Sequence, residues 1–298
     1  MIRLFLGLCF MLTSIARADE AWLKDKQRIL VLGDSITQAG HYVADFDAWL
    51  VKRYPERRIA VINAGVSSET VSGLSEPGHA GGRFPRPDLH ERLERVLTAA
   101  KPDLIIACYG MNCGIYQPLD EQRFQAYRDG TLRLRKAAAA HGADIVHVTP
   151  PIFDSHGKPG FDYDEVLTAY SKWLVDQRAQ GWRVIDLHTA MRTKVDQARQ
   201  GNPKFTLQGD HIHPNRDGHW LMAQNLIAAF GDEASAALAS PDLLLGKTQR
   251  DAILARVTHY QKAIHAETKP KRPGVPAGGT LESAAAEAKA LEGVIYGR

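Results

Sequence analysis

The chain has 298 residues, of which 44% are hydrophobic and 24% are charged, and its formal net charge is +3 at pH 7. This length allows one large domain or two small ones, with a sizeable buried core. A net charge this small, without a long basic run before the C-terminal tail, excludes nucleic acid as an expected partner.

The first 18 residues have the features of a secretory signal peptide. A short basic start, Met1–Arg3, precedes an apolar stretch from Leu4 to Ile15 that is too short to span a membrane, and Ala16 and Ala18 are small residues at cleavage positions. An uncleaved anchor is the alternative interpretation. We expect residues 1–18 to be removed, leaving an exported protein, periplasmic or extracellular in a bacterium, with no stable membrane span.

Five short apolar runs follow, and each is typical of a strand buried on both faces. They cover residues 29–32, 58–62, 103–109, 144–149 and 182–187. Amphipathic segments separate these runs, with apolar residues at helical spacing within residues 42–50, 89–97, 120–141 and 166–174. Strands that alternate with helices predict an α/β fold, in which a parallel sheet has helices on both faces.

Beyond Gly231 the pattern changes. Residues 242–265 have helical periodicity, a stretch rich in lysine and proline at 269–274 interrupts it, and residues 284–291 are rich in alanine and glutamate. We therefore predict one domain over residues 19–232 and a helical, partly ordered C-terminal extension over residues 233–298.

Polar residues follow three of the predicted strands. The first strand runs into Gly33-Asp34-Ser35, the second ends in Asn63-Ala64-Gly65, and the third delivers Gly110-Met111-Asn112. In open parallel sheets, ligands bind at this end of the strands. A serine there can act as a nucleophile if a base and oxyanion donors converge on it. A fourth block, Asp210-His211-Ile212-His213-Pro214, supplies a candidate base.

Together, these four blocks resemble those of the GDSL/SGNH hydrolase family, whose marker residues Ser, Gly, Asn and His follow one another in this order. The matching positions are Ser35, Gly65, Asn112 and His213, with Asp210 in the family's Asp-x-x-His spacing. The resemblance spans about residues 28 to 230. It implies a three-layer α/β/α fold whose five parallel strands have the flavodoxin-like order.

The resemblance also implies ester cleavage by a serine nucleophile. Ser35 would attack the ester, His213 would take its proton and pass it to the leaving alcohol, and Asp210 would orient the imidazole. The backbone N–H groups of Ser35 and Gly65 and the side-chain amide of Asn112 would form the oxyanion hole. Structural alternatives stay open for two of these residues: Asp210 as the N-cap of the next helix, and Asn112 as a structural asparagine at a strand end.

One residue departs from the family pattern. The block around Asn112 usually reads Gly-x-Asn-Asp, and Cys113 stands in place of the final Asp. Because a cysteine cannot hold a loop through carboxylate hydrogen bonds, we expect looser placement of Asn112. Without the leader, the chain keeps only Cys108 and Cys113, too few for a disulfide scaffold, and we expect Cys108 to be a buried thiol.

The segment 76–87 is rich in glycine and proline, which predicts an ordered loop or a mobile flap. Loops at strand ends often carry specificity, so Arg83 and Phe84 are candidate substrate contacts. A surface loop in which Arg83 forms a local salt bridge is the alternative.

We expect neither a metal nor a cofactor. The Asp and His residues of the fourth block could, with His219, be drawn as a metal cluster, but residues so close in sequence seldom point at one ion without remote ligands. His211 is expected to face solvent or the rim of the pocket. The chain has no Gly-x-Ser-x-Gly elbow, P-loop or dinucleotide fingerprint.

These features predict a secreted serine esterase that removes short acyl groups, such as acetate, from a small ester or an acylated carbohydrate. A long-chain lipase would be expected to have a more apolar loop at residues 77–87. Two alternatives remain. The first is a hydrolase of the lysophospholipase or thioesterase type, and the second is a non-catalytic carbohydrate-binding protein that retains the fold.

Overall fold

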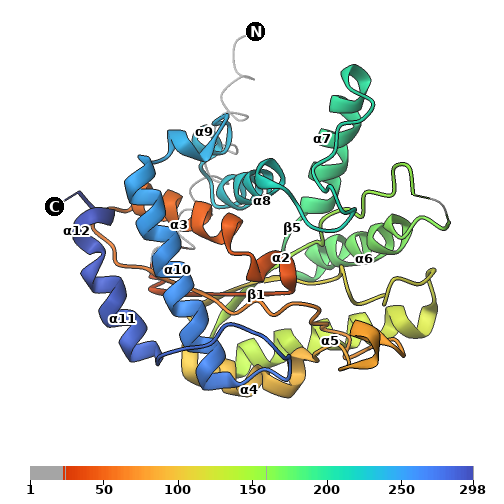
Figure 1. Ribbon diagram of the computed structural model, residues 1–298, viewed down its shortest axis with the longest axis horizontal. Coiled ribbons are helices and arrows are strands. Elements are labelled where there is room, and N and C mark those ends of the chain that lie inside the picture. The colour runs from red at the N-terminus through yellow and green to blue at the C-terminus, as the bar shows by residue number, and fades with distance from the viewer. Residues whose placement is uncertain (1–22, 24, 159, 298) are drawn as a thin grey trace, which may run out of the picture.

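The computed structural model describes residues 23, 25–158 and 160–297 (Figure 1). The predicted signal peptide lies outside the described residues. Five strands form one parallel sheet in the order β2-β1-β3-β4-β5. Their bounds are Arg28–Gly33 for β1, Ala60–Asn63 for β2, Leu104–Cys108 for β3, Asp144–Val148 for β4 and Arg183–Ile185 for β5. This is the flavodoxin-like order, so the predicted fold class is confirmed.

The interior strand β1 explains why the sequence contains continuous apolar runs. It pairs with β2 from Arg28↔Ala60 to Val31↔Asn63, and with β3 from Ile29↔Leu104 to Gly33↔Cys108. Every residue of β3 and all but the first residue of β1 are buried. A parallel strand covered on both faces needs apolar side chains at every position, and burying each large one contributes about 1.5–3 kcal/mol.

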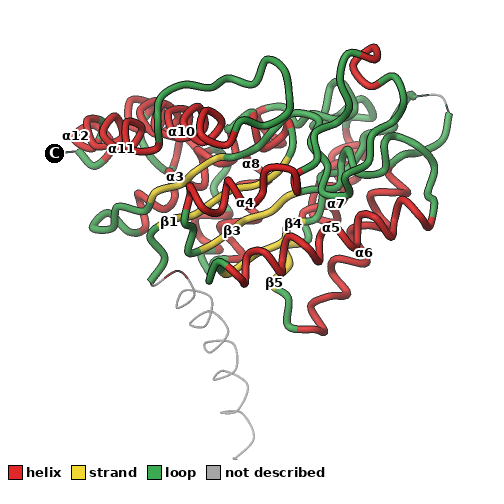
Figure 2. The backbone as a smooth tube through the Cα atoms, turned by 90° about the horizontal axis from the view of Figure 1, so that it is seen from below, coloured by secondary structure: helices red, strands yellow, loops and turns green. Residues whose placement is uncertain are grey.

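Helices cover both faces of the sheet (Figures 1 and 2). On one face, α3 (His41–Arg53) packs against α8 (Arg216–Ala229). On the other lie α4 (Leu89–Ala100) and α5 (Glu121–Ala140), with α6 (Asp164–Asp176) beside α5. The Tyr127 and Tyr170 rings join α5 to α6 with centroids 4.3 Å apart. Asp120 caps α5 by accepting a hydrogen bond from the Arg123 N–H, which fixes the start of this helix as predicted.

One long helix was not predicted, α7 (Leu187–Gly201). Its buried residues include Leu187, Met191 and Val195, spaced four apart, and this periodicity is the signal that could have revealed it. Shorter helices complete the part of the chain that the structure describes: α2 (Ser35–Gln38), η1 (His79–Gly82), η2 (Gln177–Gln180), α9 (Glu233–Ala236), η3 (Pro241–Leu243) and α12 (Glu292–Ile295). Within these described residues, no helix is both long and apolar enough to cross a bilayer.

The C-terminal segment packs on the rest of the chain through α10 (Lys247–Thr268), and α11 (Leu281–Ala290) packs on α10. Helix α10 contacts β2, α3 and α4, and so covers the edge strand β2 of the sheet (Figure 1). The buried Arg256 guanidinium donates to both carboxylate oxygens of Asp47 on α3, at 2.7 and 3.2 Å. Covering an edge strand blocks pairing with other chains. The division into residues 19–232 and 233–298 stays a prediction.

Candidate active site

Ser35 lies where the interior strand β1 ends and a short helix begins. It is the first residue of α2, and Asp34 caps this helix by accepting a hydrogen bond from the Ile36 N–H at 3.0 Å. The first N–H groups of a helix have no acceptor within that helix, so the Ser35 N–H is placed to donate outward. Gly33 allows the tight turn, because a Cβ at this position would lie 2.1 Å from the Thr37 hydroxyl oxygen.

The structure brings Ser35, His213 and Asp210 together. The Ser35 Oγ lies 2.8 Å from the His213 Nε2, although 178 residues separate them in the sequence. The His213 Nδ1 lies 2.6 Å from one carboxylate oxygen of Asp210. The other oxygen accepts the backbone N–H groups of His213 at 2.7 Å and Ile212 at 3.0 Å. The arrangement matches that of a nucleophile, a base and a group that orients the base.

Hydrogen bonding keeps Asp210 ionised. Partial burial raises its pKa, but the His213 ring and the two backbone N–H groups outweigh this and lower the pKa to about 2. The alternative that Asp210 caps the next helix is wrong. Helix α8 begins at Arg216, and its N-cap is Asn215, whose side chain accepts from the Gly218 N–H.

Hydrogen bonds from Gln208 and His211 fix the turn that carries His213. Buried Gln208 donates to the Ile152 carbonyl at 2.6 Å and to the Ile212 carbonyl at 2.9 Å. His211 has a positive φ of 73°, and its Nδ1 lies 2.6 Å from the Asp154 carbonyl oxygen. His211 is thus half-buried against the loop after β4, so it does not face solvent alone, and its expected place at the rim of the pocket stays a prediction.

His219, the third histidine considered for a metal cluster, lies in a separate, buried environment. His219 is 3% exposed and lies between Tyr42 and His41, with ring centroids 6.1 and 5.2 Å away. Across residues 23–297, apart from the two undescribed positions, no group of three or more His, Cys, Asp or Glu residues is arranged to hold a metal ion.

Gly65 packs directly against the serine-bearing helix. A Cβ at this position would lie 2.5 Å from the Gln38 backbone nitrogen, so only glycine fits. Buried Asn63 links the same two segments, because its Nδ2 donates to the Thr37 carbonyl and its Oδ1 accepts from the Gly65 N–H at 2.9 Å. The Gly65 N–H would therefore have to share or exchange this bond to reach an oxyanion. Its role as an oxyanion donor stays a prediction.

Asn112 is held firmly after β3. Its Oδ1 accepts hydrogen bonds from the Arg86 Nη1 at 2.9 Å and from the Tyr116 hydroxyl at 3.1 Å. Its Nδ2 therefore faces the other way, where it lies 3.4 Å from the Glu69 carbonyl oxygen.

These contacts of Asn112 do not match the looser placement that we expected from the presence of Cys113. The Cys113 thiol instead points into the core, where burial raises its pKa to about 12. Cys113 and Cys108 are both buried and free.

Sequence reasoning missed Arg86 and chose its neighbours. Arg86 is 8% exposed and binds Glu76 with two hydrogen bonds of 2.6 and 2.7 Å, which closes the base of the 76–86 loop. Arg83 is exposed and donates to the Ala80 carbonyl, whereas Phe84 packs between His79 and the Arg272 guanidinium. No contact joins Arg83 or Phe84 to the Ser35 site within the described chain, so their substrate contact stays a prediction.

We expect Arg86→Met to lower kcat for a short-chain ester by about 10-fold with little change in KM, because Asn112 loses the charged donor that orients its amide. Steady-state kinetics measure both constants. Arg133→Met, which removes an equally long side chain from the exposed side of α5, is the matched control and should leave both constants unchanged. Equal kinetics for the two variants would show that Arg86 serves only the loop.

A buried network of charged residues lies next to Gly65, one of the predicted oxyanion donors. Arg92 and Glu69 form a fully buried ion pair at 2.6 Å, and the Tyr109 hydroxyl donates to the same carboxylate at 2.6 Å. The Arg92 guanidinium also donates to the Ala64 carbonyl at 2.7 Å, next to Gly65. Burial raises the pKa of Glu69, and the positive charge of Arg92 only partly offsets this increase. The ion pair fixes the end of β2 where the site begins.

Asp34 makes stability depend on pH. Burial raises its pKa from 3.8 to about 6, since hydrogen bonding to Ile36 and the charge of His213 only partly offset the loss of solvent. Below about pH 4 both folded and unfolded chains hold this proton. Between about pH 4 and pH 6 the unfolded chain is ionised while the folded chain still holds the proton, so about 2–3 kcal/mol of stability is lost by the time the pH rises through the folded pKa.

We expect Asp34→Asn to flatten this dependence and to raise neutral-pH stability by about 1–3 kcal/mol, because an amide oxygen still caps α2 without carrying a charge. Urea unfolding at several values between pH 4 and pH 8 measures the effect. Asp196→Asn, on the exposed side of α7, is the control and should keep the wild-type slope. A wild-type slope in Asp34→Asn would contradict the burial of an ionisable carboxyl here.

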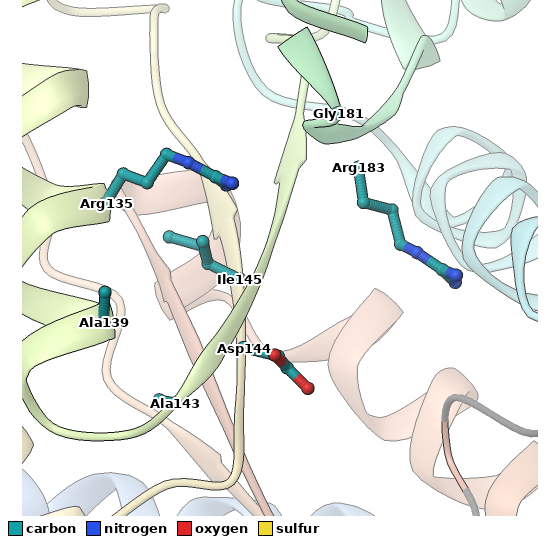
Figure 3. Close-up of a pocket in the computed structure, with 7 residues that line it drawn as sticks. All are labelled: Arg135, Ala139, Ala143, Asp144, Ile145, Gly181 and Arg183. Atoms are coloured by element: carbon teal, nitrogen blue, oxygen red, sulfur yellow. The ribbon is translucent and has the colours of Figure 1, made fainter.

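A cavity of about 400 Å³ lies at the amino ends of β4 and β5, whereas Ser35 follows the carboxyl end of β1 (Figure 3). The Arg135 side chain reaches toward β4 and the Arg183 side chain points away from it, so the two guanidinium groups do not converge. None of the residues that line this cavity is Ser, Cys or His. The lining residues are Arg135, Ala139, Ala143, Asp144, Ile145, Gly181 and Arg183. The candidate chemistry lies at the carboxyl ends of the strands.

Comparison with known proteins agrees with this geometry. The sequence profile of the GDSL-like Lipase/Acylhydrolase family matches residues 31–221. The chain belongs to this family. The resemblance inferred from the four blocks is thus confirmed, and the protein is a carboxylic ester hydrolase of the GDSL/SGNH type. Among curated proteins, none matches the sequence.

Solved structures share the fold over 69% of the chain. The acetylxylan esterase Axe2 from Geobacillus stearothermophilus is 21% identical, with a TM-score of 0.54 and 94% of its chain covered. LAE5, an alpha/beta hydrolase from the metagenome of Lake Arreo, is 25% identical, with a TM-score of 0.53 and 95% covered. A gut microbial diltiazem-metabolizing enzyme is 24% identical, with a TM-score of 0.55, and this chain covers only 47% of its length.

Proposed function

We propose that this hydrolase is an exported serine esterase that removes short acyl groups, acetyl among them, from carbohydrate esters by a Ser-His-Asp mechanism. The observation that carries the proposal is the chain of contacts from the Ser35 Oγ to the His213 Nε2, at 2.8 Å, and from the His213 Nδ1 to Asp210, at 2.6 Å. A candidate nucleophile, a base and an orienting carboxylate thus meet just after β1, which supports acyl transfer as the reaction.

The reaction would proceed in two halves. The Ser35 hydroxyl attacks the ester carbonyl carbon while the His213 Nε2 takes its proton, and the resulting tetrahedral intermediate expels the alcohol as His213 returns that proton to the alcohol oxygen. Water then attacks the acyl-serine with His213 again as base, which releases the acid and restores the hydroxyl. Asp210 stays ionised and accepts the Nδ1–H, since its pKa of about 2 lies far below neutral pH.

The intermediate carries a negative oxygen that needs preorganised donors. The outward N–H of Ser35 and the Nδ2 of Asn112 are the first two, and the Arg86 and Tyr116 hydrogen bonds to Oδ1 set the orientation of that amide. The Gly65 N–H would join them by exchanging its bond to Asn63. Loss of one such donor typically lowers the rate about 100- to 1,000-fold.

The openness of the site supports a short acyl group on a large polar alcohol. The side chains of His213 and Asp210 are 48% and 56% exposed, which suits a bulky substrate that approaches from solvent. A long acyl chain would need an extended apolar surface to bury its methylene groups, each worth about 0.8 kcal/mol. The likeness to an acetylxylan esterase fits this substrate class.

A substrate panel tests the proposal. We expect hydrolysis of chromogenic acetate and of acetylated xylo-oligosaccharides, with rates that fall as the acyl chain lengthens. Faster hydrolysis of lysophospholipids or acyl thioesters would favour the alternative hydrolase type. Saturable binding of glycans without any turnover would support the non-catalytic alternative and overturn the esterase. Export is tested separately by N-terminal sequencing of the secreted chain, which should begin at Asp19; a retained leader would contradict it.

A further inference from the structure

The C-terminal helix α10 reaches the backbone of the active site with two side chains. The Gln261 Nε2 donates to the Gln38 carbonyl at 2.8 Å, and the His265 Nε2 lies 3.0 Å from the Gly65 carbonyl oxygen. Residues four apart lie on the same face of a helix, so one face of α10 presents both side-chain nitrogens. His265 is 1% exposed and Gln261 is 9% exposed. These contacts are therefore shielded from water.

The two carbonyls belong to the two segments that build the site. Gln38 ends the short helix α2 that begins with Ser35, and Gly65 follows β2 at the oxyanion side. The same segments touch directly, since a Cβ at Gly65 would lie 2.5 Å from the Gln38 nitrogen. A shift of either segment would change the spacing between the serine and the oxyanion donors. Misplacement by about 1 Å can cost about 100-fold in rate.

Helix α10 is itself fixed in place. The buried pair of Arg256 and Asp47 joins it to α3, and the other ring nitrogen of His265, Nδ1, lies 3.0 Å from the Pro276 carbonyl oxygen in the loop before α11. Burial lowers the pKa of His265 to about 4, so the ring is neutral at pH 7 and carries one N–H. That single proton can serve the Gly65 carbonyl or the Pro276 carbonyl, and not both.

We propose that Gln261 and His265 are positioning residues for ester hydrolysis, and that the C-terminal extension is thereby a working part of the active site. The inference rests on the proposed function, because it assigns these residues to the spacing between Ser35 and its oxyanion donors. They act through the backbones of Gln38 and Gly65 and touch no substrate.

Two substitutions of His265 separate the contacts that the ring makes. The amide of His265→Gln reaches as far as the ring Nε2 and retains a donor for Gly65, whereas the shorter His265→Asn reaches as far as Nδ1 and retains one only for Pro276. We expect His265→Asn to lower kcat for chromogenic acetate by about 10-fold with KM within about 2-fold of wild type, and His265→Gln to restore most of the activity. Gln261→Met, which removes the donor to Gln38, should also lower kcat.

Thermal unfolding of each variant runs alongside the kinetics. A lower Tm with wild-type kcat in His265→Asn and Gln261→Met would overturn the inference and leave α10 a purely structural cover. Equal losses in His265→Asn and His265→Gln would also overturn it, since the Gly65 contact would then be irrelevant. Either result leaves the proposed function intact if Ser35→Ala is inactive, whereas an active Ser35→Ala would refute the proposed function itself.

Discussion

Ser35→Ala is expected to lower kcat/KM for a short-chain ester by about 10⁴- to 10⁶-fold, because the variant has no atom that can form the acyl-enzyme. The remaining oxyanion donors would leave a small rate above that of water. Hydrolysis of a chromogenic acetate at matched enzyme concentrations measures the loss. The Ser35 Oγ makes its hydrogen bond with the exposed His213, so the thermal midpoint should stay close to that of the wild type.

Ser155→Ala is a matched control for this experiment. Ser155 lies on the polar loop after β4, and it also loses one hydroxyl. It should keep the wild-type rate. Turnover by Ser35→Ala at the wild-type rate would exclude Ser35 as the nucleophile, whatever the geometry around it.

His213→Ala is expected to cause a loss of similar size, about 10⁴- to 10⁶-fold in kcat, because no other base lies in hydrogen-bond contact with the Ser35 hydroxyl within the described residues. Because Ser35 and His213 act together in one step, the loss of both side chains should lower kcat no more than the loss of either one. The double variant Ser35→Ala with His213→Ala should therefore retain the same residual rate as either single variant, and kinetics of all three proteins check this.

His211→Asn is the control for His213, two residues away in the same turn. Asparagine tolerates the positive φ that His211 adopts, and its side-chain amide can reach the Asp154 carbonyl in place of the ring Nδ1. We expect near wild-type activity. If His211→Asn were as inactive as His213→Ala, the integrity of the turn would explain the loss and the base would remain unidentified.

The fold could be predicted because its signals are local. Each strand of a sheet covered on both faces must be apolar throughout, and the runs around Ile29 and Ile105 show this without any knowledge of their neighbours. The marker residues were equally accessible, since Ser35, Asn112 and His213 lie in short blocks directly after predicted elements. Helix ends were predicted well where a side chain caps them, as Asp120 does for α5.

The supporting contacts could not be predicted, because they join segments that are distant in the sequence. Nothing local distinguishes Arg86, which holds Asn112 across 26 residues, from Arg83, which donates to the Ala80 carbonyl in its own loop. His265 lies 200 residues from Gly65, in a segment whose composition gave no sign of a link to the site. The bond from the Gly65 N–H to Asn63 differs from these, because asparagine side chains often accept the N–H two residues further on, so the local pattern could have indicated it.

Labelling with an organofluorophosphonate shows whether Ser35 is an activated nucleophile, since such a reagent requires a serine whose proton a nearby base can take. We expect one adduct per chain, located by peptide mass mapping on the segment that contains Ser35, and almost no adduct in His213→Ala. An adduct on another residue, or ester hydrolysis that persists at the wild-type rate after Ser35 has been fully labelled, would contradict this.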